Sequence, residues 1–142
     1  GVTFAGAQAA IPSPEALQAL QAADLVIIGP SNPLISVAPI LEVVRGHLDR
    51  ERTIAVTPIV AGAALKGPTV EMMRALTFDP SPLQVARMYR DVAATFVLDQ
   101  RDRELGPAIE TLGYRTLIYD TVMRDGGRSL ARSVLEESLT DV

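Results

Sequence analysis

The stretch GPSNPLIS, residues 29–36, carries residue types that suit the binding of a phosphate group. Gly29 permits a close approach to the backbone, and the side-chain donors beside it are those of Ser31, Asn32 and Ser36. The stretch follows the apolar run Leu25–Ile28 and precedes apolar residues at helical spacing. A turn that leads from a strand into a helix presents unpaired N–H groups and the positive end of the helix dipole. We therefore predict a phosphate-binding loop, the alternative being that these residues only cap the helix.

A second small-residue loop contains Lys66, the only lysine of the chain. Residues 58–69 follow a predicted strand and include GAALKGPT, in which the order Lys-Gly differs from the Gly-Lys-Ser/Thr of a P-loop and excludes that motif. In a parallel sheet this loop would lie at the same edge as GPSNP. Lys66 could then pair with a phosphate as a point charge. A lysine that faces solvent is the equally weighted alternative.

A third candidate is Asp120, which directly follows the predicted strand Arg115–Tyr119 in the sequence DTVMR. A carboxylate at that end of a strand could hold a metal, act as a base or contact a ribose hydroxyl. More often, such an aspartate accepts hydrogen bonds from nearby backbone N–H groups, and that structural role is the favoured interpretation.

The other polar residues favour structural roles. Arg87 and Arg90 lie three residues apart on a predicted helix, where pairing with Asp91 or Glu71 is the simpler explanation. His47, the only histidine, lies near a helix C-terminus, where a cation is favourable. One histidine and no cysteine exclude a zinc site made of these residues and a Cys–His dyad. A Mg²⁺ ion held by carboxylates stays possible.

Strand and helix patterns alternate along the chain. The predicted strands are Val2–Phe4, Leu25–Ile28, Thr53–Thr57, Thr95–Leu98 and Arg115–Tyr119. Six helices are predicted. The first begins after the cap residue Ser13, and the fifth is capped by Asp102 and ended by Gly113. The other four span Ser36–Leu48, Val70 to Leu76, Ser81–Asp91 and Gly126–Ser138. This alternation predicts an α/β fold with a mostly parallel sheet, in which the strand Leu25–Ile28 is covered on both faces.

Composition limits the classes of function. With 142 residues, 48% of them hydrophobic and 21% charged, the chain suits one globular domain. A net charge of −4 argues against a general nucleic-acid binder. Its apolar runs are far shorter than the roughly 20 residues of a membrane span, and no signal peptide opens the chain, so we expect a cytoplasmic protein. The opening GVTFAG, without methionine, indicates a fragment.

Four motifs in order give the sequence a resemblance to a known family. They are GPSNP followed by ISVAPIL, then TPIVAGAALKGP, then ARMY, then DTVM. Over residues from about Phe4 to Leu135 the chain resembles the C-terminal half of the 2-phospho-L-lactate transferase family. The arginine-rich, lysine-poor composition is similar to that of actinobacterial members, in which the transferred group is thought to be phosphoenolpyruvyl rather than phospholactyl.

The resemblance implies a Rossmann-like α/β fold with helices on both faces of the sheet, and a homodimer. It implies transfer of a phospho-acid from a guanosine diphosphate-linked donor to the deazaflavin alcohol Fo, with release of GMP and with Mg²⁺, in the biosynthesis of coenzyme F-420. The residues that match the family's motifs are Gly29, Pro30, Ser31, Asn32, Pro33 and Ser36 for the donor phosphates, Gly62, Lys66 and Gly67 in the second loop, and Asp120, Thr121 and Met123 as possible substrate or metal contacts.

The chain departs from the family pattern in one respect. The glycine-rich loop that opens the family, and the acidic metal ligands expected in its N-terminal half, have no counterpart here. We therefore expect residues 1–142 to form one α/β unit, the C-terminal part of a larger transferase, which is inactive alone and whose catalytic and metal-binding residues are not identified.

Two alternatives belong to other classes of function. One is a non-catalytic regulator of the same superfamily that binds a sugar nucleotide through a GPGS loop; the sequence Ser31-Asn32-Pro33 favours the transferase instead. The other is an α/β interaction domain without a ligand, which is favoured if Ser31, Asn32 and Ser36 are all occupied in helix capping.

Overall fold

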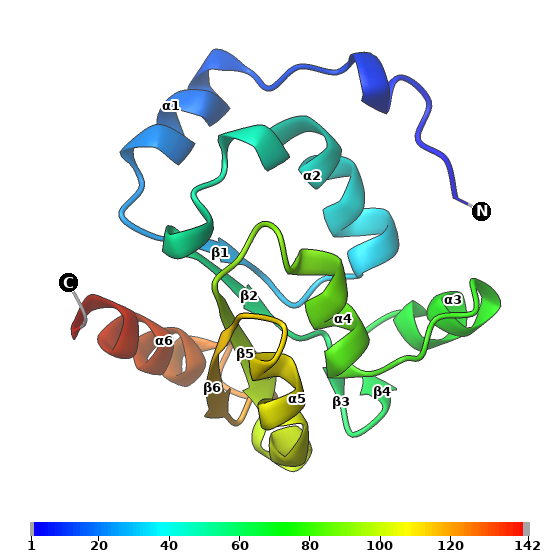
Figure 1. The fold of residues 1–142 in the computed structure, drawn as a ribbon, viewed down its shortest axis with the longest axis vertical. Coiled ribbons are helices and arrows are strands. Elements are labelled where there is room, and N and C mark those ends of the chain that lie inside the picture. The colour runs from blue at the N-terminus through cyan, green and yellow to red at the C-terminus, as the bar shows by residue number, and fades with distance from the viewer. Residues whose placement is uncertain (1, 141–142) are drawn as a thin grey trace.

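A parallel sheet of four strands forms the centre of the protein in a computed structural model, which describes residues 2–140 (Figure 1). The strands are β1 (Val26–Ile28), β2 (Thr53–Val56), β5 (Thr95–Asp99) and β6 (Arg115–Tyr119), in the spatial order β1-β2-β5-β6. Each neighbouring pair runs parallel. The predicted α/β fold with a parallel sheet is therefore confirmed.

Helices cover both faces of this sheet. They are α1 (Pro14–Ala22), α2 (Ala38–Val44), α3 (Thr69–Ala75), α4 (Pro82–Tyr89), α5 (Gly106–Glu110) and α6 (Arg128–Thr140). Because successive strand residues point to opposite faces, Ala55 and Phe96 join the cluster formed with α2 to α5, while Ile54 and Val97 join the cluster formed with α6. The Rossmann-like arrangement follows from this alternation.

Two helices begin as their sequence signals predict. The Ser13 hydroxyl accepts a hydrogen bond from the Ala16 N–H at 3.2 Å, and the Ser81 hydroxyl accepts one from the Gln84 N–H at 3.2 Å. A proline follows each cap at the first helical position, where a missing N–H costs nothing. Tyr89, from the ARMY motif, is buried in the core, and Asp91 pairs with Arg45 rather than with Arg87 or Arg90.

The single helix predicted over Ser36–Leu48 is wrong in detail. The chain first forms a π-helical turn over Pro33–Val37, then α2, then a 3-10 turn over Arg45–His47. Pro39 explains the widened start: it has no N–H to donate back to Ile35, and its ring disfavours the regular geometry four residues earlier. His47 lies in the final 3-10 turn, near the end of the helical segment as predicted.

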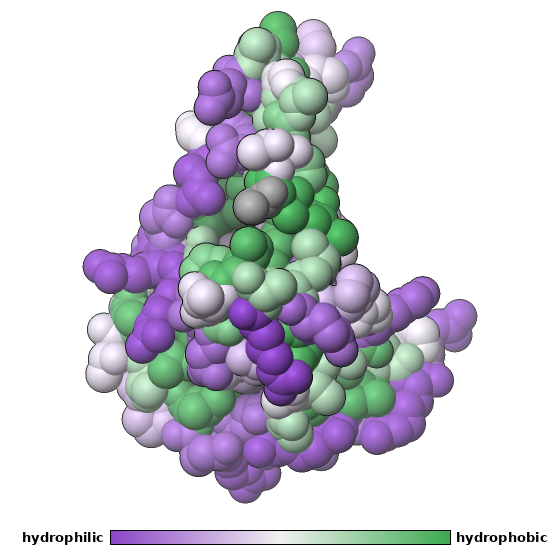
Figure 2. Space-filling model, turned by 90° about the vertical axis from the view of Figure 1, so that its right-hand side faces the viewer, coloured by the Kyte–Doolittle hydropathy of each residue, from purple (hydrophilic) through white to green (hydrophobic). Residues whose placement is uncertain are grey.

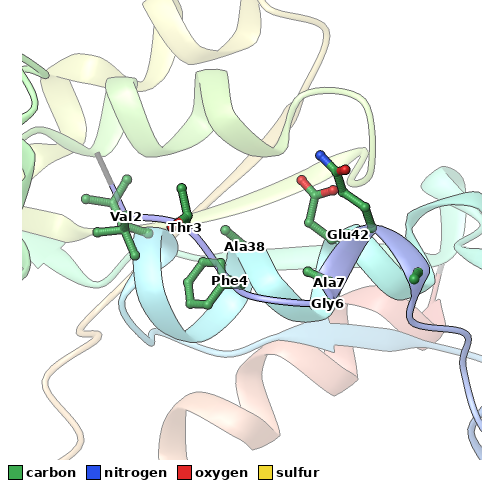
Figure 3. A pocket seen from close by; sticks show the side chains of 10 residues that line it. Val2, Thr3, Phe4, Gly6, Ala7, Ala38 and Glu42 are labelled. Carbon is green, nitrogen blue, oxygen red and sulfur yellow. The ribbon is translucent and has the colours of Figure 1, made fainter.

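Two predictions about strands are also wrong. Residues Val2–Phe4 are not a strand, because they run across α2 rather than beside a sheet edge (Figure 3). Strand β1 is not covered on both faces, since Ile27 is 45% exposed and α1 contributes no buried residue. Ile27 lies on the same face as its register partner Ile54, where α6 packs against the other strands and leaves Ile27 exposed.

Asp102 does not cap the helix after β5. Asp99 does so, by accepting a hydrogen bond from the Arg101 N–H at 3.0 Å, and the chain forms a 3-10 helix over Gln100–Leu105 before α5 begins. Gly113 follows α5 with φ of 92°, in agreement with its predicted role as a helix stop. None of the helices described over residues 2–140 has the length and apolar character to span a bilayer.

Candidate functional site

The three sequence-predicted loops lie at one edge of the sheet. In a parallel sheet all strands end at the same edge, so the loops after β1, β2, β5 and β6 are neighbours there (Figure 1). Direct contacts connect them in spatial order: Asn32 contacts Met72 of α3, Asp102 contacts Ala61, and Asp99 contacts Thr121. The loop after β5, residues 99–105, lies between the second and third candidate loops.

The first loop is held mainly by Asn32. Its side-chain oxygen accepts hydrogen bonds from the N–H groups of Leu34 at 2.9 Å and Ile35 at 3.3 Å, and its backbone oxygen accepts from Ser36 and Val37. The expectation that the first-turn N–H groups lack partners is therefore wrong for these residues, because the asparagine caps the turn itself. The Ser31 N–H also donates to the Gly29 oxygen at 2.8 Å.

Open space remains beside this loop. A cleft of about 300 Å³ lies between β1 and α2, where Gly29, Ser31 and Ser36 line one end and apolar side chains line the rest. A side chain added at Gly29 would meet no atom within 4 Å. Pro33 is buried, whereas Pro30 is half-buried. The two serines thus lie beside an open, mostly apolar cleft.

The second loop contains a short antiparallel hairpin that the sequence pattern did not predict. Strands β3 (Ile59–Val60) and β4 (Ala63–Ala64) pair through a two-residue turn at Ala61 and Gly62, with φ of 49° and 76°. Positive φ at both central residues is the pattern of a type I′ turn, which suits glycine but is costly for alanine. Asp102 accepts a hydrogen bond from the Ala61 N–H at 2.8 Å and so supports this costly conformation.

Lys66 and Gly67 follow the hairpin. Both are exposed, and Gly67 has φ of 74° just before α3 begins at Thr69. Within residues 2–140, no ion pair holds the Lys66 ammonium group. The lysine therefore faces solvent at the edge of the sheet, a position that fits either of the two predicted roles.

The third loop uses Asp120 to organise its own backbone. The Asp120 carboxylate accepts a hydrogen bond from the Val122 N–H at 3.0 Å and pairs with the Arg124 guanidinium at 2.6 Å. These bonds are the ones that the favoured structural interpretation predicts, and a contact of Asp120 with a substrate or metal stays a prediction. Hydrogen bonding from the Val122 N–H and from Arg124 holds the pKa of Asp120 below its usual value. Met123 is 43% exposed, whereas Thr121 is fully buried.

Two buried carboxylates at the end of β5 stand between the second and third loops. Asp99 has no exposed surface, and its side chain accepts hydrogen bonds from the Thr121 N–H at 2.9 Å and the Thr121 hydroxyl at 3.1 Å. The other oxygen of Asp99 accepts from Arg101, through the backbone N–H at 3.0 Å and the guanidinium at 3.0 Å. Asp102 is 6% exposed and contacts the hairpin of the second loop.

The two carboxylates differ in protonation behaviour. Burial acts to raise the pKa of Asp99, but hydrogen bonds from the Arg101 and Thr121 N–H groups and the nearby guanidinium outweigh it, so the pKa is lowered. Burial also raises the pKa of Asp102, and here only the Ala61 N–H and Arg101 oppose it, so the pKa stays above its ordinary value. Asp99 therefore keeps its charge to lower pH than Asp102 does.

Asp99 was missed by the sequence reasoning, and Asp102 was assigned only to helix capping. The usable signal was an acidic residue at the end of the apolar run TFVL, followed three residues later by another. Among residues 2–140, no three histidine, aspartate or glutamate side chains are grouped closely enough to hold a metal ion. Mg²⁺ usually takes only one or two protein carboxylates, with water and substrate phosphates completing its shell, so the Mg²⁺ that the resemblance implies stays a prediction.

A cavity larger than this cleft lies apart from these loops. It has a volume of about 560 Å³ and is formed where residues 2–9 pass over α2 (Figure 3). Apart from Glu42 and polar side chains of the N-terminal segment, its lining is apolar. Figure 2 shows apolar side chains gathered on the side of the molecule where this segment lies. None of the predicted site residues lines the cavity, so the sheet edge is the better candidate.

Comparison with known proteins agrees with the motif order. The family model described as 2-phospho-L-lactate transferase CofD matches residues 2–120. The 2-phospho-L-lactate transferase of Methanosarcina barkeri is 36% identical over 99% of this chain and 46% of that protein. Those of Methanopyrus kandleri and Methanothermobacter thermautotrophicus are each 39% identical, over 95% and 90% of this chain.

The chain spans about half the length of the curated relatives that it matches, with 46%, 44% and 43% of these three proteins covered. The similarity nevertheless extends over almost all of the present sequence, and it includes every loop at the carboxyl edge of the sheet up to Asp120. The chain therefore belongs to the 2-phospho-L-lactate transferase family.

Proposed function

We propose that the full-length protein transfers a phospho-acid group, phosphoenolpyruvyl or 2-phospho-L-lactyl, from a guanosine diphosphate-linked donor to the deazaflavin alcohol Fo, releasing GMP, in coenzyme F-420 biosynthesis. Family membership supports this proposal, since the matched relatives are named 2-phospho-L-lactate transferases. The observation that carries the assignment to this chain is the meeting of the three predicted loops at one sheet edge.

In this proposal the two loops nearest β1 bind the donor phosphates. Ser31 and Ser36 offer hydroxyl groups beside an open cleft, and Lys66 offers an exposed ammonium group without an ion pair in the described part of the chain. Phosphoryl-type transfer depends mostly on positioning and on stabilising developing negative charge, which is what hydroxyl and ammonium donors supply. The apolar walls of the cleft suit a flat aromatic acceptor such as Fo.

Mg²⁺ stays part of the proposal, with its ligands outside the described residues. A Mg²⁺ ion commonly takes one or two carboxylates, with water and substrate phosphates completing its near-octahedral shell, and the resemblance implies that most acidic metal ligands lie in the N-terminal half of the family. We therefore expect the metal ligands and the catalytic base to come from the part of the full-length protein that the relatives' greater length represents.

Calorimetric titration of the full-length protein tests the proposal. GDP, Fo and a UDP-sugar are titrated in separate experiments. Binding of GDP and Fo without binding of the UDP-sugar is the expected result. Binding of the UDP-sugar alone would instead identify a sugar-nucleotide-binding regulator. If none of the three ligands binds, an interaction domain without these ligands remains.

The Lys66→Gln variant tests the assigned loop. Loss of one charged phosphate contact is expected to weaken GDP binding about 10-fold, on the order of 1.5 kcal/mol. Arg74→Gln is the matched control, because Arg74 is also an exposed cation, but lies on α3 away from the loop. Equal affinities of the two variants for GDP would contradict the role of Lys66.

A further inference from the structure

Strand β5 is the central element between the second and third candidate loops. Its neighbours in the sheet are β2 on one side and β6 on the other, and the loops that follow these two strands carry Lys66 and Asp120. The turn after β5 therefore lies where it can reach both loops. Its two buried carboxylates do so in opposite directions, Asp102 toward Ala61 and Asp99 toward Thr121.

We propose that Asp99 and Asp102 are positioning residues of this enzyme, each holding one flanking loop in the shape that the donor site needs. This inference rests on the proposed function. Asp102 acts through the hairpin turn at Ala61, and so positions the loop that carries Lys66. Asp99 acts through Thr121, and so positions the loop that carries Asp120 and Met123.

The contact of Asp102 supports a conformation that the sequence alone disfavours. Ala61 has φ of 49°, in the left-handed region that residues other than glycine rarely adopt. One oxygen of Asp102 accepts from the Ala61 N–H at 2.8 Å, and the aspartate itself is almost fully buried. Without that acceptor, the turn would lose its buried partner and its alanine would relax toward negative φ, which would move the loop before Lys66.

The contact of Asp99 is of a different kind, because both of its oxygens are used. One accepts from the N–H and hydroxyl of Thr121, and the other accepts from Arg101. Arg101 in turn lies 4.0 Å from the Asp120 carboxylate. Asp99 therefore connects the end of β5 to the third loop through two routes. Each route uses one of its two oxygens as an acceptor, so both oxygens are needed.

This difference predicts opposite responses to the same conservative change. An asparagine at 102 can still accept from the Ala61 N–H through its one carbonyl oxygen, so Asp102→Asn should behave like the wild type, whereas Asp102→Ala should not. An asparagine at 99 must direct its NH₂ group toward one of the two sets of donors. Asp99→Asn should therefore lose the hydrogen bonds from either Thr121 or Arg101. Thr121→Val, which removes only the hydroxyl donor, provides a milder variant if Asp99→Asn does not fold.

The experiment uses the full-length protein, with GDP titration and hydrogen–deuterium exchange as the two readouts. For Asp102→Ala we expect GDP affinity about 5-fold weaker or more, with faster exchange in residues 57–68 and unchanged exchange in residues 120–127. Addition of Ala61→Gly should recover part of the affinity, since glycine adopts positive φ without strain. For Thr121→Val, the faster exchange should be confined to residues 120–127; for Asp99→Asn it should appear in residues 120–127 and in residues 100–105, which Asp99 also caps.

The outcomes separate this inference from the proposed function. A wild-type protein that does not bind GDP refutes the proposed function, and with it any positioning for a GDP-linked donor. A wild-type protein that binds GDP, together with an Asp102→Ala variant that matches it in affinity and exchange, refutes the inference alone. Two further results also overturn the inference: a loss of GDP affinity in Asp102→Asn equal to that in Asp102→Ala, or no recovery of affinity when Ala61→Gly is added. In either case Asp102 would not affect GDP binding through the turn at Ala61. Asp79→Asn, at an exposed position between α3 and α4, serves as the control.

Discussion

At the scale of single residues, Asp99 and Asp102 show how placement decides the behaviour of the same side chain. Both are buried and lie three residues apart. Asp99 receives hydrogen bonds on both oxygens and lies beside the Arg101 guanidinium, so its pKa is lowered despite burial. The pKa of Asp102 is raised by burial, because the hydrogen bond from Ala61 does not compensate for the lost water. These opposite shifts predict opposite dependences of stability on pH.

The Asp99→Asn variant should change the acid limb of the stability curve. A carboxyl whose pKa is lowered on folding stabilises the protein above its unfolded pKa and loses that contribution as the pH falls through the folded pKa. We expect the free energy of unfolding to drop by about 2–3 kcal/mol at neutral pH, and to depend less on pH below about pH 4 than in the wild type.

Urea unfolding at a series of pH values measures both effects, and Asp102→Asn is the matched comparison. In the wild type, the raised pKa of Asp102 means that its ionised form is disfavoured in the folded state. Ionisation of Asp102 therefore lowers the free energy of unfolding as the pH rises through the folded pKa. Removing the ionisable group should therefore leave stability at neutral pH unchanged or slightly higher. An acid limb equally steep in Asp99→Asn and wild type would contradict the role of Asp99.

The Ala61→Gly variant should stabilise the protein. The left-handed conformation of Ala61 costs about 1–2 kcal/mol, and glycine avoids that cost at some expense in unfolded-state entropy. The expected gain is about 0.5–1 kcal/mol in the free energy of unfolding, measured by urea titration. Ala63→Gly, in strand β4, should instead destabilise, because that position pairs with Val60 in the hairpin. A loss of stability in Ala61→Gly would mean that the turn is not strained.

At the scale of elements, equal caps should have unequal consequences. Ser13 and Ser81 accept the same kind of hydrogen bond at the same distance, 3.2 Å. Helix α1 buries none of its residues, whereas α4 places Val85, Ala86 and Tyr89 in the core. A cap on a helix that is part of the core stabilises the whole fold, while a cap on a peripheral helix stabilises only that helix.

Substitution of each cap by alanine tests this difference. Ser81→Ala should lower the free energy of unfolding by about 1 kcal/mol, the usual effect of losing an N-cap. Ser13→Ala should leave global stability nearly unchanged and instead increase amide exchange within α1. Thermal unfolding and hydrogen exchange measure the two effects. Equal losses of global stability would show that α1 unfolds together with the core.

At the scale of the whole molecule, stability should decrease from the centre of the sheet to the β1 edge. Strand β5 lies between β2 and β6, and its residues Phe96, Val97, Leu98 and Asp99 have no exposed surface. The Phe96 ring also packs against Tyr114, with centroids 5.5 Å apart, and the Tyr114 hydroxyl donates to the Ala86 oxygen at 2.7 Å. Strand β1 pairs with one neighbour and exposes Ile27.

The pair Phe96→Ala and Ile27→Ala should make this gradient measurable. Truncation of Phe96 empties a packed site between the sheet and the helices and should cost about 3–5 kcal/mol. Truncation of Ile27, which is 45% exposed, should cost less than about 1 kcal/mol. Denaturant unfolding of both variants is the measurement. A large loss at Ile27 would contradict this gradient, because it would show that the side chain is covered.

Much of the fold could be predicted from the sequence, because its determinants are local. The apolar run TFVL, the Ser-Pro starts at Ser13 and Ser81, and the stop at Gly113 each act on a few consecutive residues, and the structure confirms all of them. The order of loops at the sheet edge was also predictable once a parallel sheet was inferred, since parallel strands end on the same side. Two of the errors, at Val2–Phe4 and at the start of α2, arose where the lack of a partner strand among residues 2–140 or the presence of Pro39 outweighed local propensity.

The sequence by itself determined the strand–helix alternation, the three polar loops and their motif order, because spacing and residue type are properties of the chain. Only the tertiary structure decided which polar groups are already used. Asn32 caps its own turn, Asp120 binds its own loop, and Lys66 stays exposed at the edge. The structure alone also placed Asp99 and Asp102 between the loops. Their hydrogen bonds join residues 22 and 41 positions apart, and such distant pairs form only when the folded sheet brings them together.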